Sequence, residues 1–368
     1  MDNAITDFLA SIGSEEVTDV EEEAFLLFSQ EIPTTNLGFL DSRASSLDIP
    51  IGSHEYTVHQ SPTLLSSSRA GGTTGAVLWK ITPCFAEWVS NPANPLRTHS
   101  LLSETSVVAE LGCGISALVA LALAPSVQHY LATDQEYVRR LFRTNVEANS
   151  SVSSIPSTAL GKSKGSKAKA GGKSSVKGKR PPQSPASNIT FTTLDWERDQ
   201  PELLKQCISS NSGHTALARD AGQVDDEQEV GDRGFDLLLS CDCVYNEALV
   251  APFVRTCAEI CRLRPLYNPL EGQKTGPGRR PTICIVAQQQ RAPDVFETWL
   301  RETLRRNGIS GSSFAGQRAG EVLRYDSVKA SRFVCNGLRH MYDTTEVGIF
   351  PPKASQAFLS RDMSGAAI

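Results

Sequence analysis

Short apolar stretches alternate with amphipathic ones through the later two thirds of the chain. The runs 106–112, 127–134, 188–196, 235–245 and 282–287 are rich in β-branched and other apolar residues and predict strands. Between them, apolar residues recur three or four positions apart and predict helices over 115–124, 135–149, 247–261 and 294–305. Strands and helices that alternate at these lengths form a parallel sheet with right-handed crossovers. The pattern predicts an α/β, doubly wound, mostly parallel domain over 101–345.

The first hundred residues follow a different pattern and are expected to form a separate lead-in. Residues 1–50 are expected to be an acidic extension. Its acidic run is followed by an apolar pattern at 24–28 that is typical of a helix. Residues 51–100 are expected to pack on the sheet domain. They contain an alternating strand at 54–59, a glycine- and serine-rich loop at 66–75, and an aromatic stretch with a helix from about Pro83.

Three inserts interrupt the domain, and residues 346–368 are expected to be a tail. The insert 150–187 holds eight Lys and Arg and no acid, a composition that cannot bury a core and predicts disorder. The insert 212–233 is acidic, and 264–281 is rich in glycine and proline. The basic run 161–180 is either an ordinary solvated segment or an electrostatic contact to RNA or the ribosome.

Composition describes an ordinary soluble globule, with 368 residues, 40% apolar residues and a net charge of −5. No run of 18 apolar residues or signal peptide is present, so neither a membrane span nor secretion is expected. Nine scattered cysteines lack the paired spacing of a zinc site, which favours buried thiols over a metal. We therefore expect a cytoplasmic location, with the nucleus as the alternative.

A glycine turn after the first strand of the sheet is the strongest sign of a ligand site. The strand delivers Glu110 to a turn at Gly112 and Gly114, whose missing side chains let a ligand approach the backbone. The segment G112-C-G-I-S-A117 fits a dinucleotide fingerprint, and Asp134 stands where a ribose-binding acid would be. These two features alone suit a dinucleotide oxidoreductase and an S-adenosylmethionine methyltransferase equally.

Three further features favour S-adenosylmethionine. The charge of Glu110 would oppose a pyrophosphate but complement an ammonium group. Trp196, after the third strand, offers an indole face to adenine. Polar residues from Ser240 onward follow the fourth strand, beside the point where ligands bind in such sheets.

Five sequence blocks follow one another in a fixed order. They are T73-T-G-A-V-L-W79 with T82-P-C-F-A-E-W88, E110-L-G-C-G-I-S116, T133-D-Q135, L194-D-W-E197 and S240-C-D-C-V-Y-N-E247. In this order they resemble the seven-stranded protein-lysine methyltransferases grouped as methyltransferase family sixteen. Within that family, the fungal ribosomal lysine methyltransferases, which modify a stalk protein of the large subunit, resemble the chain more closely. Many methyltransferases carry a third glycine where Ser116 stands here.

This resemblance implies a Rossmann-like methyltransferase fold with a seven-stranded sheet, S-adenosyl-L-methionine as cofactor, and a lysine of a large-subunit ribosomal protein as acceptor. It also implies a role for each matching residue. Trp79 would contact the cofactor; Glu110, Gly112, Cys113 and Gly114 would line its methionine side; Asp134 would hold the ribose, Trp196 would flank the adenine, and Ser240 would contact the cofactor. Asp242 and Tyr245 match the family's Asp-x-x-Tyr signature at the lysine entrance.

Methyl transfer to an amine needs alignment of the amine within about 3–3.5 Å and a neutral lone pair, although free lysine has a pKa of about 10.4. We assign Asp242 to orienting the amine and Tyr245 to the wall of a desolvated channel. The protein is expected to act as a monomer, with no membrane partner.

Plainer interpretations stay open. Asp242 could instead cap the helix that begins near Asn246, and Asp134 could cap the helix that follows it. Trp79, Trp88 and Tyr245 could simply be packed in the core. Two other functions remain: a small-molecule or nucleic-acid methyltransferase on the same fold, although D242-C-V-Y245 lacks the prolines of an N-P-P-Y-like tetrad, and a non-catalytic ribosome-associated scaffold.

Overall fold

A single twisted sheet organises the molecule. The computed structural model describes residues 3–12, 15–17, 19–29, 38–69, 72–150, 187–209, 234–264, 280–308, 331–334 and 345–350. The sheet has eight strands in the order β1-β9-β10-β8-β7-β4-β5-β6. The strands are β1 (Glu15–Glu16), β4 (Val107–Leu111), β5 (His129–Asp134), β6 (Ile189–Thr193), β7 (Leu237–Cys241), β8 (Ile283–Gln289), β9 (Ser331–Val334) and β10 (Thr345–Phe350).

Five strands, β8-β7-β4-β5-β6, are parallel, and the remaining pairings are antiparallel. The predicted doubly wound, mostly parallel sheet is confirmed. The chain runs outward from β4 through β5 to β6 and then returns to the other side of β4 at β7, so the strand order reverses at β4. A crevice at the carboxyl ends of β4 and β7 follows from this reversal, and ligands bind at such crevices.

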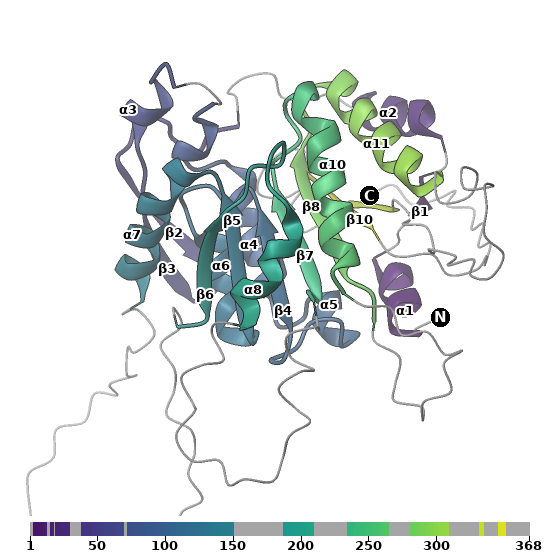
Figure 1. The fold of residues 1–368 in the computed structure, drawn as a ribbon, viewed down its shortest axis with the longest axis horizontal. Helices are drawn as coiled ribbons and strands as arrows, with labels where there is room; N and C mark the ends of the chain where they lie inside the picture. Colours follow the sequence, from purple (N-terminus) through teal and green to yellow (C-terminus); the bar gives the residue numbers. More distant parts are fainter. Residues whose placement is uncertain are drawn as a thin grey trace, which may run out of the picture.

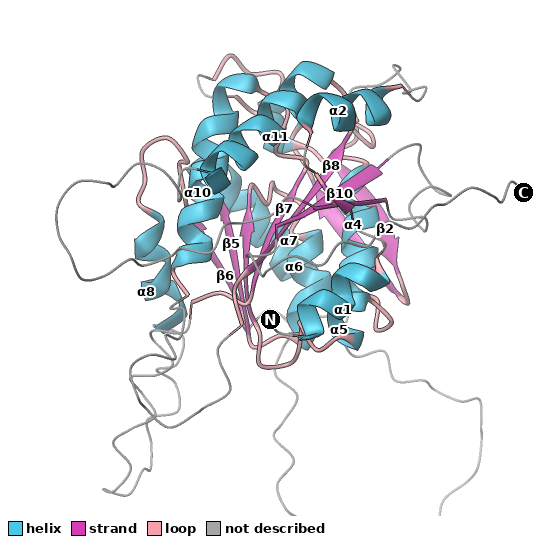
Figure 2. Ribbon diagram, turned by 90° about the vertical axis from the view of Figure 1, so that its right-hand side faces the viewer, coloured by secondary structure: helices cyan, strands magenta, loops and turns pink. Residues whose placement is uncertain are grey.

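Helices cover both faces of the sheet (Figures 1 and 2). One face carries α4 (Ile81–Ser90), α5 (Pro95–Thr98), α6 (Leu118–Leu123) and α7 (Arg139–Asn149), and the other carries α8 (Leu204–Ser209), α10 (Glu247–Arg262) and α11 (Pro293–Gly308). Alternate residues of a strand enter the two cores. Val107 and Ala109 belong to one core and Val108 to the other, so β4 is fully buried as its continuous apolar sequence predicted.

The N-terminal segment is an integral part of the domain and not a separate extension. In α1 (Asn3–Ser11), Ile5 and Phe8 are buried in the main core. Helix α2 (Val20–Phe28) packs on α11, where the Phe28 and Phe296 rings lie 5.6 Å apart. Strand β1 pairs with β9. The packing of these N-terminal elements could not be predicted from the sequence, because an acidic run does not show that the neighbouring apolar residues contact the sheet domain.

A separate two-stranded hairpin, β2 (Ser46–Ile51) and β3 (His54–His59), lies against α7. Asn145 and Asn149 of α7 bond to the hairpin backbone in place of a third strand. Asn145 accepts from His59 N at 2.7 Å and donates to the carbonyls of His59 and Ile115 at 2.9 and 2.7 Å. Asn149 pairs in the same way with both backbone groups of Thr57, at 2.9 Å each. These contacts tie the hairpin to the turn after β4.

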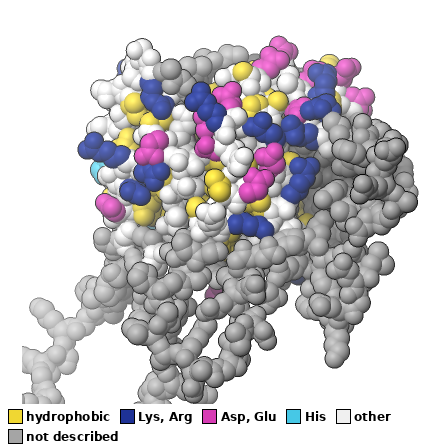
Figure 3. All heavy atoms as spheres, in the orientation of Figure 1, with side chains coloured by type: hydrophobic (Ala, Val, Ile, Leu, Met, Phe, Trp, Pro, Cys, Tyr) yellow, Lys and Arg dark blue, Asp and Glu magenta, His cyan; other side chains and the backbone are white. Residues whose placement is uncertain are grey.

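The solvent side of α10 and α11 is a mixed surface. Figure 3 shows basic and acidic side chains interspersed over this face. On α11, Arg301 pairs with Glu297, and Arg305 and Arg306 both pair with Glu302 at 2.8 Å. No helix among the described residues is both long and apolar enough to span a bilayer.

The three predicted inserts fall largely outside the described residues, so their predicted disorder stays a prediction. The predicted tail is corrected at its start. Strand β10 pairs along its whole length with β8, from Thr345 opposite Gln289 to Phe350 opposite Cys284. The sheet domain therefore extends at least to Phe350.

Candidate active site

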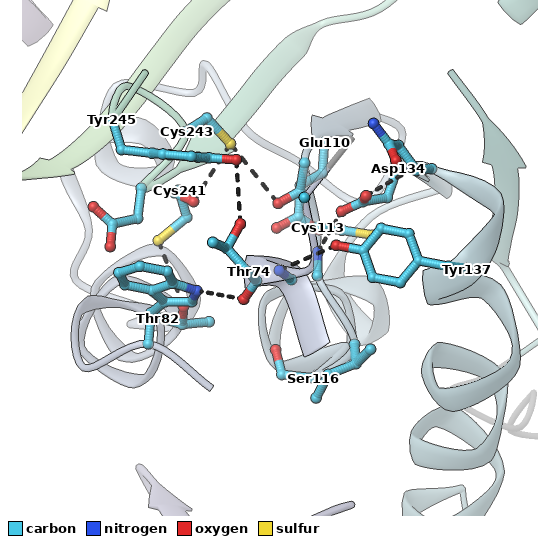
Figure 4. A pocket seen from close by; sticks show the side chains of 18 of the residues that line it. Thr74, Thr82, Glu110, Cys113, Ser116, Asp134, Tyr137, Cys241, Cys243 and Tyr245 are labelled. Carbon is cyan, nitrogen blue, oxygen red and sulfur yellow. Dashed lines mark hydrogen bonds between the residues drawn. The ribbon is translucent and has the colours of Figure 1, made fainter. Parts of the chain in front are cut away.

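A cavity opens at the carboxyl ends of β4, β5 and β7, where the strand order predicts a ligand (Figure 4). The space open to the centre of a water molecule is about 110 Å³, far more than the ~10–15 Å³ that one buried water needs. Nine of the ten predicted site residues line it: Trp79, Glu110, Gly112, Cys113, Gly114, Asp134, Trp196, Asp242 and Tyr245. Thr74 and Tyr245 lie on one side of the cavity and Asp134 and Tyr137 on the other.

The glycine turn has no room for a side chain at Gly112. Gly112 has φ +65°, and a Cβ there would lie 2.4 Å from Cys243 Sγ and 3.3 Å from Trp196 Cζ2. Gly114 also has positive φ, at +59°, and its N–H donates to Asp134 Oδ2 at 2.8 Å. The turn thus brings backbone to the cavity wall and is held there by Asp134.

The absent third glycine has a structural explanation. The left-handed residue that completes the turn is Ala117, with φ +57°, and Ser116 before it has no positive φ. Ser116 therefore fits at the position where many methyltransferases carry glycine, and it contributes to the cavity wall. Because Ala117 is left-handed, α6 begins at Leu118 instead of at residue 115 as predicted.

Glu110 brings a buried acid to the floor of the cavity. It is 2% exposed, and Tyr130 OH donates to its Oε2 at 2.8 Å. Burial raises the pKa of Glu110 to about 8; the Tyr130 hydrogen bond opposes the shift and the charge of Asp134 adds to it. A positively charged ligand would stabilise the ionised carboxylate.

Asp134 lies at the end of β5, as predicted, and faces the same space. Its Oδ1 accepts from Gln135 N at 2.6 Å and its Oδ2 from Gly114 N, so it also holds the start of the next helical segment. Burial raises its pKa to about 6, and the two backbone N–H groups oppose that shift. Each carboxylate oxygen has a further lone pair, so capping and hydroxyl binding are compatible.

Trp196 follows β6 and forms the apolar wall beside Gly112. Its ring lies 5.1 Å from that of Phe253, and its carbonyl accepts from Arg255. Cys243 lies on the same side of Gly112 as Trp196, and its Sγ is 3.4 Å from the Leu111 carbonyl oxygen. A flat apolar ring of a ligand fits against such a wall.

Trp79 and Tyr245 form an aromatic entrance. Their rings are nearly parallel, at 24°, with centroids 6.5 Å apart. Thr74 joins them, because Trp79 Nε1 donates to its carbonyl at 3.0 Å and its hydroxyl donates to Tyr245 OH at 3.2 Å. Tyr245 is 40% exposed, so it stands at the rim and is not plain core. Trp88, by contrast, stacks on Phe85 at 5.9 Å within the core.

Asp242 is more enclosed than the sequence suggested. It has φ +61°, is 5% exposed, and accepts from both Nη atoms of Arg291, with the Nη1 contact at 2.7 Å. Gln288 Nε2 and Gln289 N also donate to its Oδ1, at 3.0 and 3.3 Å. Burial raises the pKa of Asp242, and the Arg291 guanidinium opposes that shift. Its carboxylate thus anchors the turn before Tyr245, which differs from the predicted role of orienting an amine.

Two other expectations concern this strand end. The cap of α10 is Asn246, whose side chain accepts from Ala248 N at 3.1 Å, so Asp242 does not cap that helix. Ser240 is fully buried in β7, and its hydroxyl donates to the Leu111 carbonyl at 3.2 Å. Ser240 does not line the cavity, because its side chain is turned to the neighbouring strand β4, so its predicted cofactor contact stays a prediction.

Several cavity and supporting residues were not predicted. Tyr137 OH accepts from Gly75 N at 3.2 Å, and Arg69 stacks on its ring at 4.4 Å. Arg291 supports the entrance from outside the cavity. Their positions in the sequence could have identified both residues. Tyr137 follows β5 and Arg291 follows β8, and ligands bind near the carboxyl ends of parallel strands.

Known proteins support the resemblance expected from the motifs. No protein-family model matches the chain. A Zygosaccharomyces rouxii protein named ribosomal lysine N-methyltransferase 5 is 27% identical over 275 residues, covering 68% of this chain and 71% of that protein. A Candida glabrata protein of the same name is 28% identical over 275 residues, covering 68% and 69%. The predicted resemblance is confirmed.

Two other similarities are narrower. A Schizosaccharomyces pombe protein named diaminohydroxyphosphoribosylamino-pyrimidine deaminase is 36% identical over 134 residues, but these cover only 32% of that protein. A solved Streptococcus mutans structure described as a methyltransferase with bound SAH aligns at a TM-score of 0.34 and 7% identity, over 75% of this chain and 100% of that chain. At this TM-score the alignment adds nothing to the fold that the strand order gives.

Proposed function

We propose that this chain, a homologue of the fungal ribosomal lysine N-methyltransferases, is an S-adenosylmethionine-dependent protein-lysine N-methyltransferase. The observation that carries the proposal is one continuous cavity with two unlike ends. Its inner end joins a glycine turn to the buried Glu110, the half-buried Asp134 and Trp196, and its outer end is the aromatic pair Trp79 and Tyr245. A charged donor and an amine acceptor require these two environments side by side.

The inner residues fit the donor. Desolvation raises the pKa values of Glu110 and Asp134, and an ammonium group and ribose hydroxyls would give these acids polar partners. Gly112 and Trp196 form an apolar wall for adenine. When bound, S-adenosylmethionine supplies a methyl group on a positively charged sulfur.

The outer residues prepare the acceptor. A lysine ammonium that passes between Trp79 and Tyr245 loses water, which lowers its pKa and favours the neutral amine. Burial raises the pKa of the Tyr245 phenol, so its oxygen can accept a hydrogen bond but does not act as a base at neutral pH. The lysine proton leaves to solvent at the exposed rim. Alignment within about 3–3.5 Å of the methyl group then completes the catalytic requirement.

The acceptor that we propose is a lysine of a large-subunit ribosomal protein. The relatives are named for ribosomal lysine methylation, and both match this chain over about two thirds of their length. A protein acceptor suits an entrance that is open at one rim, with Tyr245 40% exposed, because only the lysine side chain has to enter.

Calorimetry with S-adenosylhomocysteine tests the donor half of this proposal. We expect one site per chain, and we expect Asp134→Asn and Trp196→Ala to weaken binding at least tenfold. Asp294→Asn, an exposed acid at the start of α11, is the matched control and should bind normally. A wild-type protein that binds no S-adenosylhomocysteine would favour the non-catalytic scaffold.

We also propose that the basic segment 161–180 contacts ribosomal RNA. The support is its composition alone, with eight Lys and Arg between residues 161 and 180 and no acid. Deleting 161–180 should raise the KM for isolated large subunits and flatten its salt dependence, while S-adenosylhomocysteine affinity stays unchanged. An unchanged salt dependence would show the segment to be merely solvated.

A further inference from the structure

Arg291 lies directly behind the acceptor entrance without lining the cavity. It is the second residue after β8, and its side chain is 22% exposed. Its guanidinium touches both sides of the entrance. It pairs with Asp242 on one side, and its Cζ lies 4.7 Å from the centre of the Trp79 ring on the other.

On the first side, Arg291 fixes the turn that leads to Tyr245. Asp242 receives both Nη groups, and Gln288 braces the same turn by donating to Asp242 Oδ1 and accepting from Val244 N at 2.9 Å. The left-handed backbone of Asp242, with φ +61°, is unfavourable for a non-glycine residue and persists only where surroundings hold it. The ion pair and Gln288 supply that hold.

On the second side, Arg291 supports Trp79. Residues 38–40 run alongside Trp79 and are bonded to the residues on either side of it. Gly38 O accepts from Lys80 N at 2.7 Å, and Leu40 N donates to Leu78 O at 3.0 Å. Phe39 packs on the Trp79 ring with centroids 4.5 Å apart. A Cβ on Gly38, which has φ +85°, would lie 2.7 Å from Arg291 Nη2. The backbone therefore closes over the guanidinium and leaves it little freedom.

We propose that Arg291 is a positioning residue that fixes the two walls of the acceptor entrance, Trp79 and the Asp242–Tyr245 turn, at the spacing that aligns the incoming amine. This inference rests on the proposed lysine methyltransferase function. In this proposal Asp242 does not contact the amine itself. It pairs with Arg291 and so holds the turn that places Tyr245. A misplacement of about 1 Å at a reacting centre can cost about 100-fold in rate, which sets the scale of the expected effect.

The geometry calls for arginine specifically. A planar guanidinium can donate two bonds to one carboxylate while its flat face lies on an indole ring. A lysine ammonium can keep the charge pairing with Asp242 but can neither bridge both oxygens in the same way nor stack equally on Trp79. Arg291→Lys should therefore recover part of the function of Arg291, and Arg291→Met none.

The test compares these two variants with wild type on isolated large ribosomal subunits from cells that lack this protein. We expect Arg291→Met to lower kcat about 100-fold and Arg291→Lys about 10-fold, while the Kd for S-adenosylhomocysteine changes less than threefold. Arg301→Met removes an arginine from α11 that is 56% exposed and serves as the matched control, with kcat unchanged. An Arg291→Met kcat within twofold of wild type would overturn the inference, and so would a parallel loss of S-adenosylhomocysteine affinity.

A double variant separates positioning from simple charge balance. Arg291→Met leaves the buried Asp242 carboxylate without its cation, which alone destabilises the fold. Adding Asp242→Asn removes that charge and should restore the melting temperature, but kcat should stay at least tenfold low. Full recovery of kcat would contradict a positioning role. Failure of the proposed function differs from every one of these results, because wild type itself would then transfer no methyl group to the subunits.

Discussion

At the residue scale, the site depends on backbone that approaches its neighbours where side chains are absent. Gly112 and Gly114 were identified from sequence because a glycine pair after a buried strand has few other uses. What sequence could not provide is the identity of the atoms they approach. Cys243 follows β7 and Trp196 follows β6, and they meet Gly112 from 131 and 84 positions away in the chain.

Gly112→Ala should abolish S-adenosylhomocysteine binding and lower stability, because the new Cβ would lie 2.4 Å from Cys243 Sγ. Gly52→Ala is the matched control. Gly52 has a similar φ of +58°, but its Cβ would meet nothing within 4 Å. The difference between the two variants in calorimetry and thermal unfolding isolates the close approach from backbone strain. Equal losses in both would contradict the close packing at Gly112.

Glu110 predicts a pH dependence of stability. Its pKa in the folded protein is about 8, above the ordinary 4.5, so its stabilising contribution is complete below pH 4.5 and is lost as pH rises through 8. The free energy of unfolding of the unliganded protein should therefore fall between pH 4.5 and 8, and this slope should be reduced in Glu110→Gln. Urea unfolding across this range measures it. Exposed Glu104→Gln is the control and should keep the wild-type slope; a Glu110→Gln slope equal to wild type would refute the assignment.

At the element scale, the predicted order of strands and helices in the sheet domain agrees with the structure, while α6 begins at Leu118 and not at residue 115. The central strands β4 and β7 were predicted because each is fully buried and therefore apolar along most of its length. The hairpin strand β2 was missed, since Pro50 within Ser46–Ile51 argues against a strand unless it lies at an edge. The hydrogen bonds from Asn145 and Asn149 to the hairpin could not be predicted from the sequence either. Polar residues on a helix are ordinarily taken to face solvent, and only tertiary structure shows that these two are buried.

Asn145→Ala should destabilise the protein by about 3 kcal/mol, because it leaves the N–H and carbonyl of His59 and the carbonyl of Ile115 without their partner at about 1 kcal/mol each. Urea unfolding measures the change. Its exposed neighbour gives the control, and Thr144→Ala should cost less than about 0.5 kcal/mol. A loss of similar size in both variants would mean that the asparagine contacts contribute little.

At the scale of the whole molecule, the N-terminal residues belong to the same folding unit as the sheet. The sequence suggested an extension, because a short helix reveals its apolar face but not the surface that receives it. The site shows the same limit: nine of ten predicted residues meet at one cavity, but the pairing of Asp242 with Arg291 depends on β7 and β8 lying side by side.

Phe8→Ala should lower the free energy of unfolding by about 3–5 kcal/mol, because Phe8 is fully buried in the main core. Phe25→Ala changes the same residue type at a side chain that is 72% exposed, and should cost less than about 0.5 kcal/mol. Denaturant unfolding distinguishes the two. A negligible effect of Phe8→Ala would show that the N-terminal helix does not contribute to the domain.

Methyl transfer to lysine is the central claim, and mass spectrometry of ribosomal proteins tests it most directly. Large subunits from cells lacking this protein are incubated with the purified protein and S-adenosylmethionine, and their proteins and RNA are then analysed separately. We predict methylation of a lysine in one large-subunit protein, and none when the protein carries Trp196→Ala. Methyl groups found on RNA, or on no component at all, would contradict the account.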